Sequence, residues 1–401
     1  MQLPQLSSNI PKITIVGAGA AGCFCAAQLK SGLPGADISI IEAGRRPLAK
    51  LSITGGGRCN ISNDFSTVHS LAEVYPRGAN LMKRALKEFP VQATLDWFGK
   101  RGVLFRTENE GRIFPASDDA MQIVNTLLSA VEGVSITTGQ RFDRLSDSDI
   151  HVITCGGGRG TEILKNLPVK IETPVPSLFS FNISDSPSGG RAAITALSGL
   201  CCKAALFIPG TGLRSEGDLL ITDWGFSGPA VLKLSSYAAR YLAGLSYRSP
   251  IVVRWTLLNE NELRSEIDRI RRDNPRRMLR SVGPEGLPAR LWDYLLNRSG
   301  LEGTRLYSEL GQKGLGRLVQ TLMVDTYQIS GKNRFRDEFV TCGGVSLSSL
   351  NINTLECKEH PGLYFAGEIL DVDAITGGFN LQAAWSTAAI VSKSIISKYG
   401  T

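Results

Sequence analysis

The sequence has no run that approaches the roughly 18 consecutive apolar residues of a membrane-spanning helix. Its N-terminal residues are polar and lack the basic start and apolar run of a secretory signal. The three histidines lie far apart, and none of the eight cysteines belongs to a CxxC pair. These absences argue against a membrane protein, a compact disulfide framework and a zinc site. We expect a cytoplasmic protein without a bound metal.

Neither sign of charge dominates the chain. Its 401 residues are 42% apolar and 20% charged, with a net charge of +7. This composition predicts a globular chain of two or three domains. A mildly basic balance fits an anionic cofactor but does not by itself indicate nucleic acid.

The strongest basic cluster is RIRRDNPRRMLR at residues 269–280. Asp268 and Asp273 accompany these arginines, and the cluster holds no aromatic residue on which a base could stack. It is either a nucleic-acid contact or a solvated helix face, and we favour the second interpretation. We therefore predict a small-molecule substrate and argue against a nucleic-acid partner. The sequence carries no signal for an oligomeric state.

The order of apolar runs predicts an α/β chain with an insertion. Residues 13–16 and 38–41 are typical of buried parallel strands, and an alanine-rich helix at 20–30 joins them. Single helices are also expected over residues 81–101 and 381–398. We predict a dinucleotide-binding domain in two parts, at 1–190 and 336–401, around an inserted domain at 191–335. The insertion should hold a β-barrel over about 191–260 and a helical part over about 261–335.

A G-x-G-x-x-G motif lies between the first strand and the first helix. Gly17 allows a tight turn, Gly19 lets the backbone approach a pyrophosphate, and Gly22 lets helix and strand pack closely. The helix start, with Ala20 and Ala21, offers free N–H groups and a positive dipole end to phosphates. The alternative is a glycine turn that only closes the β-α junction.

Glu42 ends the second strand, about twenty residues past this motif. A carboxylate there can bind ribose hydroxyls and would repel a 2′-phosphate, which favours FAD or NAD over NADP. We see no second G-x-G-x-x-G motif. A nicotinamide cofactor would therefore visit the protein transiently.

Residues 50–60, KLSITGGGRCN, place three consecutive glycines before Arg58 and Asn60. Such a loop can place backbone amides, unobstructed by side chains, against a flat or anionic ligand. Arg58 can pair with a phosphate or with a substrate carboxylate, so it is our candidate for orienting an anionic substrate. The alternative is a surface loop with a solvated arginine. We expect Cys59 to pack in the loop rather than act in redox chemistry.

Residues 362–380 contain a strand that ends at Glu368, a loop, and the start of a long helix near Asn380. In two-part FAD folds such a strand end places an acid on the ribityl chain. The helix N-terminus then faces the flavin N1–C2=O edge, where its dipole stabilises the charge of a reduced flavin. Gly156 follows another strand in a turn that resembles the one returning to the cofactor in such folds. The alternative is a purely structural strand-loop-helix.

Three long runs together resemble the bacterial FAD-dependent oxidoreductases that include aminoacetone-oxidase-like and bile-acid-reductase-like enzymes. They are KLSITGGGRCN, GFSGPAVLKLS at residues 225–235, and CGGVSL with GLYFAGEILDVDAITGGFNLQAAWSTA after it. The resemblance spans residues 13 to about 394. It implies one FAD per chain in a split Rossmann-like domain, with an inserted domain that has a β-barrel and a helical part.

The motifs and the resemblance together indicate the cofactor-binding residues. These are Gly17, Gly19, Ala20, Ala21, Gly22, Glu42, Lys50, Leu51, Gly57, Arg58, Asn60, Gly156, Gly367, Glu368, Gly378, Asn380 and Leu381. Two departures from the family bear on the chemistry. Asp223 stands where members usually carry histidine, and the stretch at 156–176 is shorter than in the family.

Two functional hypotheses follow. The first is an enzyme that passes hydride through flavin N5, linked to NAD(P)H or to oxygen, with an unidentified small-molecule substrate. No side chain stands out as an acid or base, and Arg58 is the candidate substrate contact. The second is a non-catalytic FAD-binding module that acts through a partner such as RNA.

Overall fold

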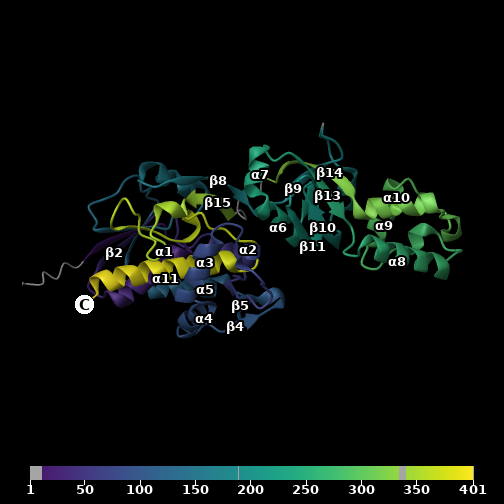
Figure 1. The fold of residues 1–401 in the computed structure, drawn as a ribbon. Helices are drawn as coiled ribbons and strands as arrows, with labels where there is room; N and C mark the ends of the chain where they lie inside the picture. The colour runs from purple at the N-terminus through teal and green to yellow at the C-terminus, as the bar shows by residue number, and fades with distance from the viewer. Residues whose placement is uncertain (1–10, 188, 334–339, 401) are drawn as a thin grey trace, which may run out of the picture. The chain divides into compact units, whose positions relative to one another are not determined.

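The computed structural model describes residues 11–187, 189–333 and 340–400. They belong to two compact units, drawn in Figure 1. Met1–Pro176 and Val340–Thr401 make up unit 1, and Ser177–Phe339 makes up unit 2. The second unit thus begins before residue 191, where the sequence pattern placed the boundary. The reason is the short strand β9 (Phe181–Ser184), which pairs with strands of unit 2.

The centre of unit 1 is a five-stranded parallel sheet in the order β16-β7-β1-β2-β6. Its strands are β1 (Lys12–Val16), β2 (Asp37–Glu42), β6 (Ser135–Thr138), β7 (Ile150–Ile153) and β16 (Leu363–Phe365). Strands β1 and β7 are almost fully buried, as parallel strands covered on both faces must be. Their carboxyl ends meet at one edge of the sheet, where doubly wound folds bind ligands.

Two buried helices, α1 (Ala20–Gly32) and α11 (Phe379–Tyr399), pack against each other in unit 1. Figure 1 shows α11 in yellow beside α1. The Phe24 ring of α1 lies 4.8 Å from the Trp97 ring of α4 (Val91–Gly99) and 5.5 Å from the Trp385 ring of α11. Burial of each such side chain contributes on the order of 1.5–3 kcal/mol. This cluster joins three helices that are far apart in the sequence.

The prediction of one helix over residues 81–101 is wrong. The structure has two helices there, α3 (Ala79–Glu88) and α4. Pro90 caps the start of α4, and Phe89 before it adopts φ −141° and ψ 86°. Proline lacks an N–H donor and disfavours helical geometry in the preceding residue, so the helix breaks here.

Unit 1 is completed by smaller elements. Helix α5 (Ala120–Ala130) packs against α1. A three-stranded sheet contains β3 (Ser62–Asn63), β5 (Arg112–Pro115) and β4 (Phe105–Thr107). A two-stranded sheet pairs β15 (Val340–Val345) with β8 (Ile171–Ser177).

Unit 2 contains a closed antiparallel barrel in the order β10-β11-β12-β9-β14-β13. Besides β9, its strands are β10 (Cys201–Phe207), β11 (Arg214–Ile221), β12 (Gly225–Ser227), β13 (Ser249–Arg254) and β14 (Asp325–Lys332). Its helices are α6 (Pro229–Tyr237), α7 (Ala239–Gly244), α8 (Glu260–Asp273), α9 (Ala289–Arg298) and α10 (Gln312–Met323). Because β14 follows the helical part and closes the barrel, the barrel extends beyond residues 191–260. The predicted fold class, a split Rossmann-like domain with an inserted barrel and helices, is confirmed.

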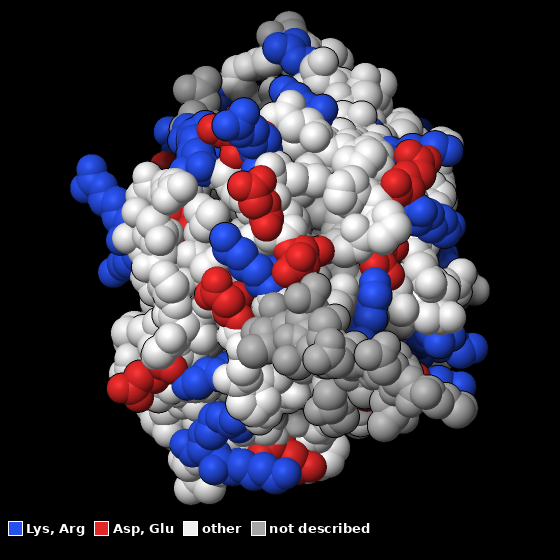
Figure 2. All heavy atoms as spheres, turned by 90° about the vertical axis from the view of Figure 1, so that its left-hand side faces the viewer, with Lys and Arg blue, Asp and Glu red and all other residues white. Residues whose placement is uncertain are grey.

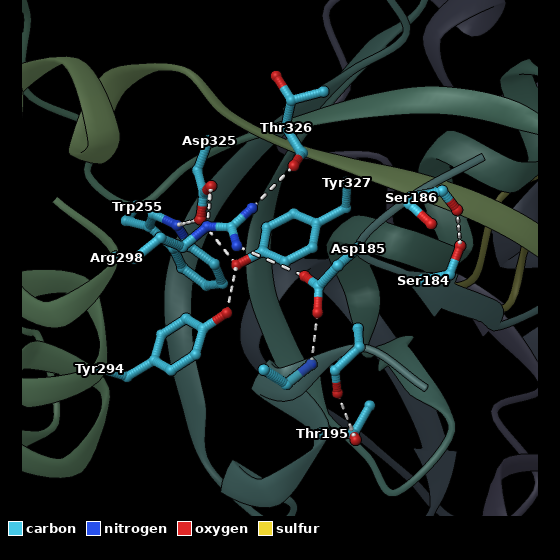
Figure 3. A network of polar contacts seen from close by, with 12 residues as sticks. Ser184, Asp185, Ser186, Thr195, Trp255, Tyr294, Arg298, Asp325, Thr326 and Tyr327 are labelled. Atoms are coloured by element: carbon cyan, nitrogen blue, oxygen red, sulfur yellow. Dashed lines mark hydrogen bonds and ion pairs between the residues drawn. The ribbon is translucent and has the colours of Figure 1, made fainter. Parts of the chain in front are cut away.

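A buried polar network fixes the helical part of unit 2 to its barrel (Figure 3). Asp325 of β14 is 4% exposed and accepts hydrogen bonds from Trp255 Nε1 at 2.9 Å and from the Tyr327 hydroxyl at 2.7 Å. Arg298 of α9 donates to the same carboxylate through Nε at 2.5 Å and to the Thr326 carbonyl at 2.9 Å. Burial raises the pKa of Asp325, and the Arg298 guanidinium opposes this shift. The ion pair therefore locks α9 against β14.

Candidate functional site

The first turn of unit 1 reveals which glycines the protein needs for its own packing. Gly17 has a φ of +103°, and a Cβ atom there would lie 2.6 Å from the Cα atom of Cys155. At Gly22 a Cβ atom would lie 2.0 Å from the Gly17 carbonyl oxygen. At Gly19, in contrast, it would meet no atom of the described residues within 4 Å. Gly19 therefore borders open space at the start of α1, where the helix dipole favours phosphate.

Glu42, at the end of β2, is held beside this turn. One of its carboxylate oxygens accepts from the Ala18 N–H at 2.7 Å, and the other accepts from the Gly44 N–H at 2.6 Å. Each carboxylate oxygen can accept a second hydrogen bond. The carboxylate is thus oriented by the backbone and retains lone pairs for ribose hydroxyls.

The turn after β7 returns to the same place. Thr154 Oγ1 donates to the Gly17 carbonyl at 2.9 Å, which ties the end of β7 to the first turn. At Gly157 a Cβ atom would lie 2.1 Å from Thr341 Oγ1 and 2.9 Å from Glu368 Oε1. The Thr-Cys-Gly-Gly turn therefore lies between the first turn and the Glu368 carboxylate.

Glu368 pairs with Lys50, 318 residues away in the chain. The Lys50 Nζ atom lies 2.8 Å from Glu368 Oε2, and Glu368 Oε1 accepts from the Thr341 N–H at 2.9 Å. Gly367 has a φ of +77°, and a Cβ atom there would lie 2.8 Å from Ala21 Cβ in α1. The Lys50 side chain is 57% exposed, so this ion pair contributes at most about 1 kcal/mol. The ion pair is therefore weak, while the Thr341 N–H also holds the Glu368 carboxylate in place.

The three-glycine loop is held open by its backbone geometry. Gly55, Gly56 and Gly57 have φ angles of +59°, +68° and +85°, which side chains other than glycine rarely adopt. A Cβ atom at Gly56 or Gly57 would meet no atom of the described residues within 4 Å. Leu51 is only 3% exposed and anchors the start of the loop. The loop thus presents bare backbone to open space.

Arg58 already has its charge matched in the structure. Its Nε atom donates to Asp118 at 2.8 Å, and its other arm pairs with Glu108. The guanidinium carbon lies 4.2 Å from the centre of the Phe114 ring. These contacts hold the pKa values of Glu108 and Asp118 below their ordinary range. A role for Arg58 in orienting an anionic substrate stays a prediction, and it requires the substrate to displace a carboxylate.

The start of α11 is tied to the 60–63 segment. With the Asn60 amide oriented to satisfy its neighbours, its oxygen accepts from the Gly378 N–H at 3.0 Å and its nitrogen donates to the Ser62 carbonyl at 3.0 Å. Gly378 has a φ of +89°, and a Cβ atom there would lie 2.1 Å from the Ser62 carbonyl oxygen. Asn380 accepts from the Ala374 N–H at 2.9 Å. Both asparagines hold the loop before α11 in place.

Sequence reasoning missed several residues that hold this loop. The buried Tyr75 hydroxyl donates to the Phe379 carbonyl at 2.8 Å, and Asn63 Nδ2 donates to the Gly377 carbonyl at 3.0 Å. Arg77 pairs with the buried Asp373. No local sequence pattern predicts these partners, because the two residues of each pair are separated by about 300 residues.

The cysteines near the site pack as neutral thiols. Burial raises the pKa of Cys59 to about 12 and that of Cys155 to about 12. All eight cysteines are free.

Among the described residues, no cluster of three His, Cys, Asp or Glu side chains could hold a metal ion. Within the same residues, no helix combines the length and the apolarity that crossing a membrane requires.

Most of the predicted residues form two groups at the carboxyl edge of the sheet in unit 1, while Leu51, Gly57 and Arg58 belong to the three-glycine loop described above. The first surrounds the opening turn and consists of Gly17, Gly19, Ala20, Ala21, Gly22, Glu42, Lys50, Gly156, Gly367 and Glu368. The second, at the start of α11, consists of Asn60, Gly378, Asn380 and the half-buried Leu381. Asp223 belongs to unit 2, where it is exposed between β11 and β12.

These residues fit an FAD molecule. The open glycines and the start of α1 suit a pyrophosphate, the Glu42 carboxylate suits a ribose, and the start of α11 suits the electron-rich edge of a flavin. The fold and this site define an FAD-binding flavoprotein of the Rossmann type. The chain belongs to the HI0933-like family, since the protein-family model described as "HI0933-like protein Rossmann domain" matches residues 11–394 of the sequence.

Three curated proteins are similar to the chain over nearly its whole length. The ribosomal RNA dihydrouridine synthase of Escherichia coli (strain K12) is 29% identical over 407 residues, covering 95% of this chain and 97% of that protein. The enzyme of the same name from Haemophilus influenzae is 27% identical, covering 98% and 99%. The 3-dehydro-bile acid delta(4,6)-reductase of Clostridium scindens is 27% identical, covering 95% and 98%.

These relatives correct one expectation. The sequence pattern argued against a nucleic-acid partner, but two of the similar proteins are named for an activity on ribosomal RNA. This expectation was wrong because it required aromatic residues, on which bases could stack, within a single basic cluster. A phosphate-binding surface needs only exposed cations.

Proposed function

We propose that this chain is an FAD-dependent reductase that converts a uridine of ribosomal RNA to dihydrouridine. The similarity to two ribosomal RNA dihydrouridine synthases, which extends over almost the full length of each protein, carries this proposal. Dihydrouridine is uridine with a hydride and a proton added across its C5–C6 double bond. When bound, reduced FAD supplies hydride to electron-poor double bonds of this kind.

The residues around the first turn would hold the adenosine end of the cofactor. Gly19 and the start of α1 would face the pyrophosphate with free N–H groups, and Glu42 would accept hydrogen bonds from the ribose. Lys50 and Glu368 would position the ribityl chain, since their ion pair is exposed and weak. The bare loop of Gly56 and Gly57 leaves room for a flat ring.

The start of α11 would set the electrostatics at the flavin. A helix N-terminus carries about half a positive charge and stabilises an anion placed against it. Asn60 and Asn380 fix the backbone of this end through hydrogen bonds to Gly378 and Ala374. We propose NAD(P)H as the reductant, bound transiently, because the sequence has a single clear dinucleotide motif. A ribosomal RNA substrate would require the cytoplasmic location that the sequence suggests.

The test is a turnover assay on ribosomal RNA. Purified protein loaded with FAD is reduced anaerobically with NADH or NADPH, and bleaching of the flavin absorbance is followed. Unmodified ribosomal RNA is then added, and its nucleosides are analysed by mass spectrometry. The proposal expects reoxidation of the flavin and a nucleoside heavier than uridine by the mass of a hydrogen molecule. Bleaching without dihydrouridine on any ribosomal RNA would contradict it.

A second candidate is the reduction of a small unsaturated ketone. The similarity to the 3-dehydro-bile acid delta(4,6)-reductase favours it, because that name also describes the reduction of conjugated double bonds. The same reduced protein is mixed with steroid dienones in place of RNA. Flavin reoxidation by the dienone and not by RNA would favour this candidate. A flavin that neither nicotinamide reduces, together with tight RNA binding, would instead favour a non-catalytic FAD module.

A further inference from the structure

The helical part of unit 2 uses arginine almost to the exclusion of lysine. Residues 260–320 contain eleven arginines and one lysine, Lys313. Arginine presents a planar fork of donors that matches a phosphate group, is always charged, and is only weakly hydrated. Arginine is therefore the cation expected where a protein binds a phosphate backbone.

Residues 269–280 are here called the arginine segment. Most of its arginines have no carboxylate partner among the described residues. Within the segment only Arg271 is paired, since it lies 3.3 Å from Asp268. Arg264, which precedes the segment, lies 2.8 Å from Glu260. Five others are exposed and make no ion pair with any described residue. These are Arg269, Arg272, Arg276, Arg277 and Arg280. The segment thus holds five cations that are available to a ligand.

The backbone of the arginine segment is fixed against a second strand of chain. The Arg277 carbonyl accepts from the Tyr307 N–H at 3.0 Å, and the Leu279 N–H donates to the Arg305 carbonyl at 2.8 Å. Trp292 Nε1 donates to the Leu279 carbonyl at 2.7 Å, and both side chains are buried. The arginine Cα atoms are therefore held in place before any ligand arrives, and the exposed Arg305 joins the same layer. Such preorganisation lowers the entropy cost of binding.

Charge on the face drawn in Figure 2 is distributed differently. On the face drawn in Figure 2, basic and acidic side chains lie intermixed among neutral ones. Within the arginine segment the only acid is Asp273, against the five unpaired arginines. The segment has no aromatic residue. A surface of this kind recognises phosphates rather than bases.

We propose that the arginine segment, together with Arg305, binds the phosphate backbone of the RNA substrate. This inference rests on the proposed function, which supplies RNA as the ligand. The segment contributes affinity that does not depend on base sequence, and the choice of uridine is made at the flavin. Binding through these arginines releases counterions from the RNA, so the affinity falls steeply as salt rises.

The test compares two triple variants with the same change in net charge. The first is Arg272→Gln, Arg276→Gln and Arg277→Gln in the arginine segment. The control is Lys203→Gln, Arg214→Gln and Arg248→Gln, which removes three exposed cations from the barrel region of unit 2. The dissociation constant for a fluorescently labelled ribosomal RNA fragment is measured by anisotropy at several salt concentrations. Flavin content and thermal unfolding show that both variants are folded.

The first triple variant should bind the fragment at least about tenfold more weakly, and its salt slope should fall by about 2, roughly 0.7 per lost phosphate contact. The control should keep the slope and affinity of the unaltered chain. In turnover assays the first variant should raise the KM for RNA and leave kcat unchanged. Equal weakening in both variants, or no change in either, would overturn the proposal.

The two proposals fail in different ways. If the unaltered chain forms dihydrouridine and the first triple variant has the same KM for RNA, the arginine surface is wrong and the proposed function stands. If the unaltered chain binds RNA through the arginine segment and forms no dihydrouridine, the surface stands and the proposed function is wrong.

Discussion

Arg77 and Asp373 form a buried ion pair that joins segments 296 residues apart in the chain. The Arg77 Nε atom donates to Asp373 Oδ1 at 2.6 Å, and a second guanidinium nitrogen donates to Oδ2. The Asp373 side chain is fully buried and the Arg77 side chain is 12% exposed. Since Asp373 lies in the loop before α11, the pair fixes the element that we expect to face the flavin.

Removal of one partner of this pair should therefore affect both stability and cofactor binding. Arg77→Met leaves the Asp373 carboxylate buried without its counter-charge, which costs about 3–5 kcal/mol of unfolding free energy. Urea unfolding and flavin content measure the two effects. The double variant Arg77→Met, Asp373→Asn should lose less than the two single variants added together. Strictly additive losses would contradict a direct interaction.

Alanine at two glycines of the first turn should impair FAD binding in both cases but lower stability at only one of them. Gly22→Ala places a Cβ atom 2.0 Å from the Gly17 carbonyl oxygen, so it should lower stability by about 1–3 kcal/mol and abolish FAD binding. Gly19→Ala meets no atom of the described residues within 4 Å, and its φ of −83° suits alanine. It should leave the unfolding temperature of the FAD-free protein unchanged while reducing the flavin-to-protein absorbance ratio. A Gly19→Ala protein with full flavin content would show that no ligand approaches this backbone.

Glu42→Gln should weaken FAD binding without unfolding the protein. The amide nitrogen of glutamine faces one of the N–H donors of Ala18 and Gly44, and the charge-assisted bond to ribose is lost. A hydrogen bond to a charged group contributes about 1.5–3 kcal/mol, so the dissociation constant should rise roughly tenfold to hundredfold. Titration of apoprotein with FAD, followed by flavin fluorescence, measures it. Glu132→Gln, an exposed site in the same unit, is the control for loss of charge.

Acid should destabilise the protein partly through His151. Burial lowers the pKa of His151 below its ordinary value, with a smaller contribution from His360. Its Nε2 atom lies 3.1 Å from the Ser146 N–H, which donates to the neutral ring. Protonation therefore favours the unfolded chain, and the contribution of His151 to stability is present above about pH 6.5 and is lost as the pH falls.

The check for His151 is a comparison with His151→Gln, which keeps an acceptor and cannot titrate. Unfolding free energies are measured by urea denaturation on both sides of about pH 6.5. The decrease on acidification should be smaller in the variant than in the unaltered chain. Equal decreases would mean that His151 does not contribute to the pH dependence.

Some of the site could be predicted because its partners are local or adjacent by a simple rule. A strand, a glycine turn and a helix in immediate succession define the first turn, and parallel pairing brings the end of the next strand beside it. Gly17, Gly19, Gly22 and Glu42 follow from this rule, and the structure places them together. The proline that splits the helix at residue 90 was also visible, but the apolar pattern on both sides concealed the break.

By itself, then, the amino-acid sequence determined the fold class, the opening β-α-β unit and the presence of a dinucleotide motif, because periodicity and glycine spacing are local properties. The tertiary structure alone decided that Arg58 is paired with Glu108 and Asp118, and that Lys50 meets Glu368. It also decided that five of the arginines at 269–280 are exposed and have no carboxylate partner among the described residues, whereas Arg271 pairs with Asp268. The physical reason is that an ion pair depends on positions within a few ångströms in space, and chain separation does not encode these.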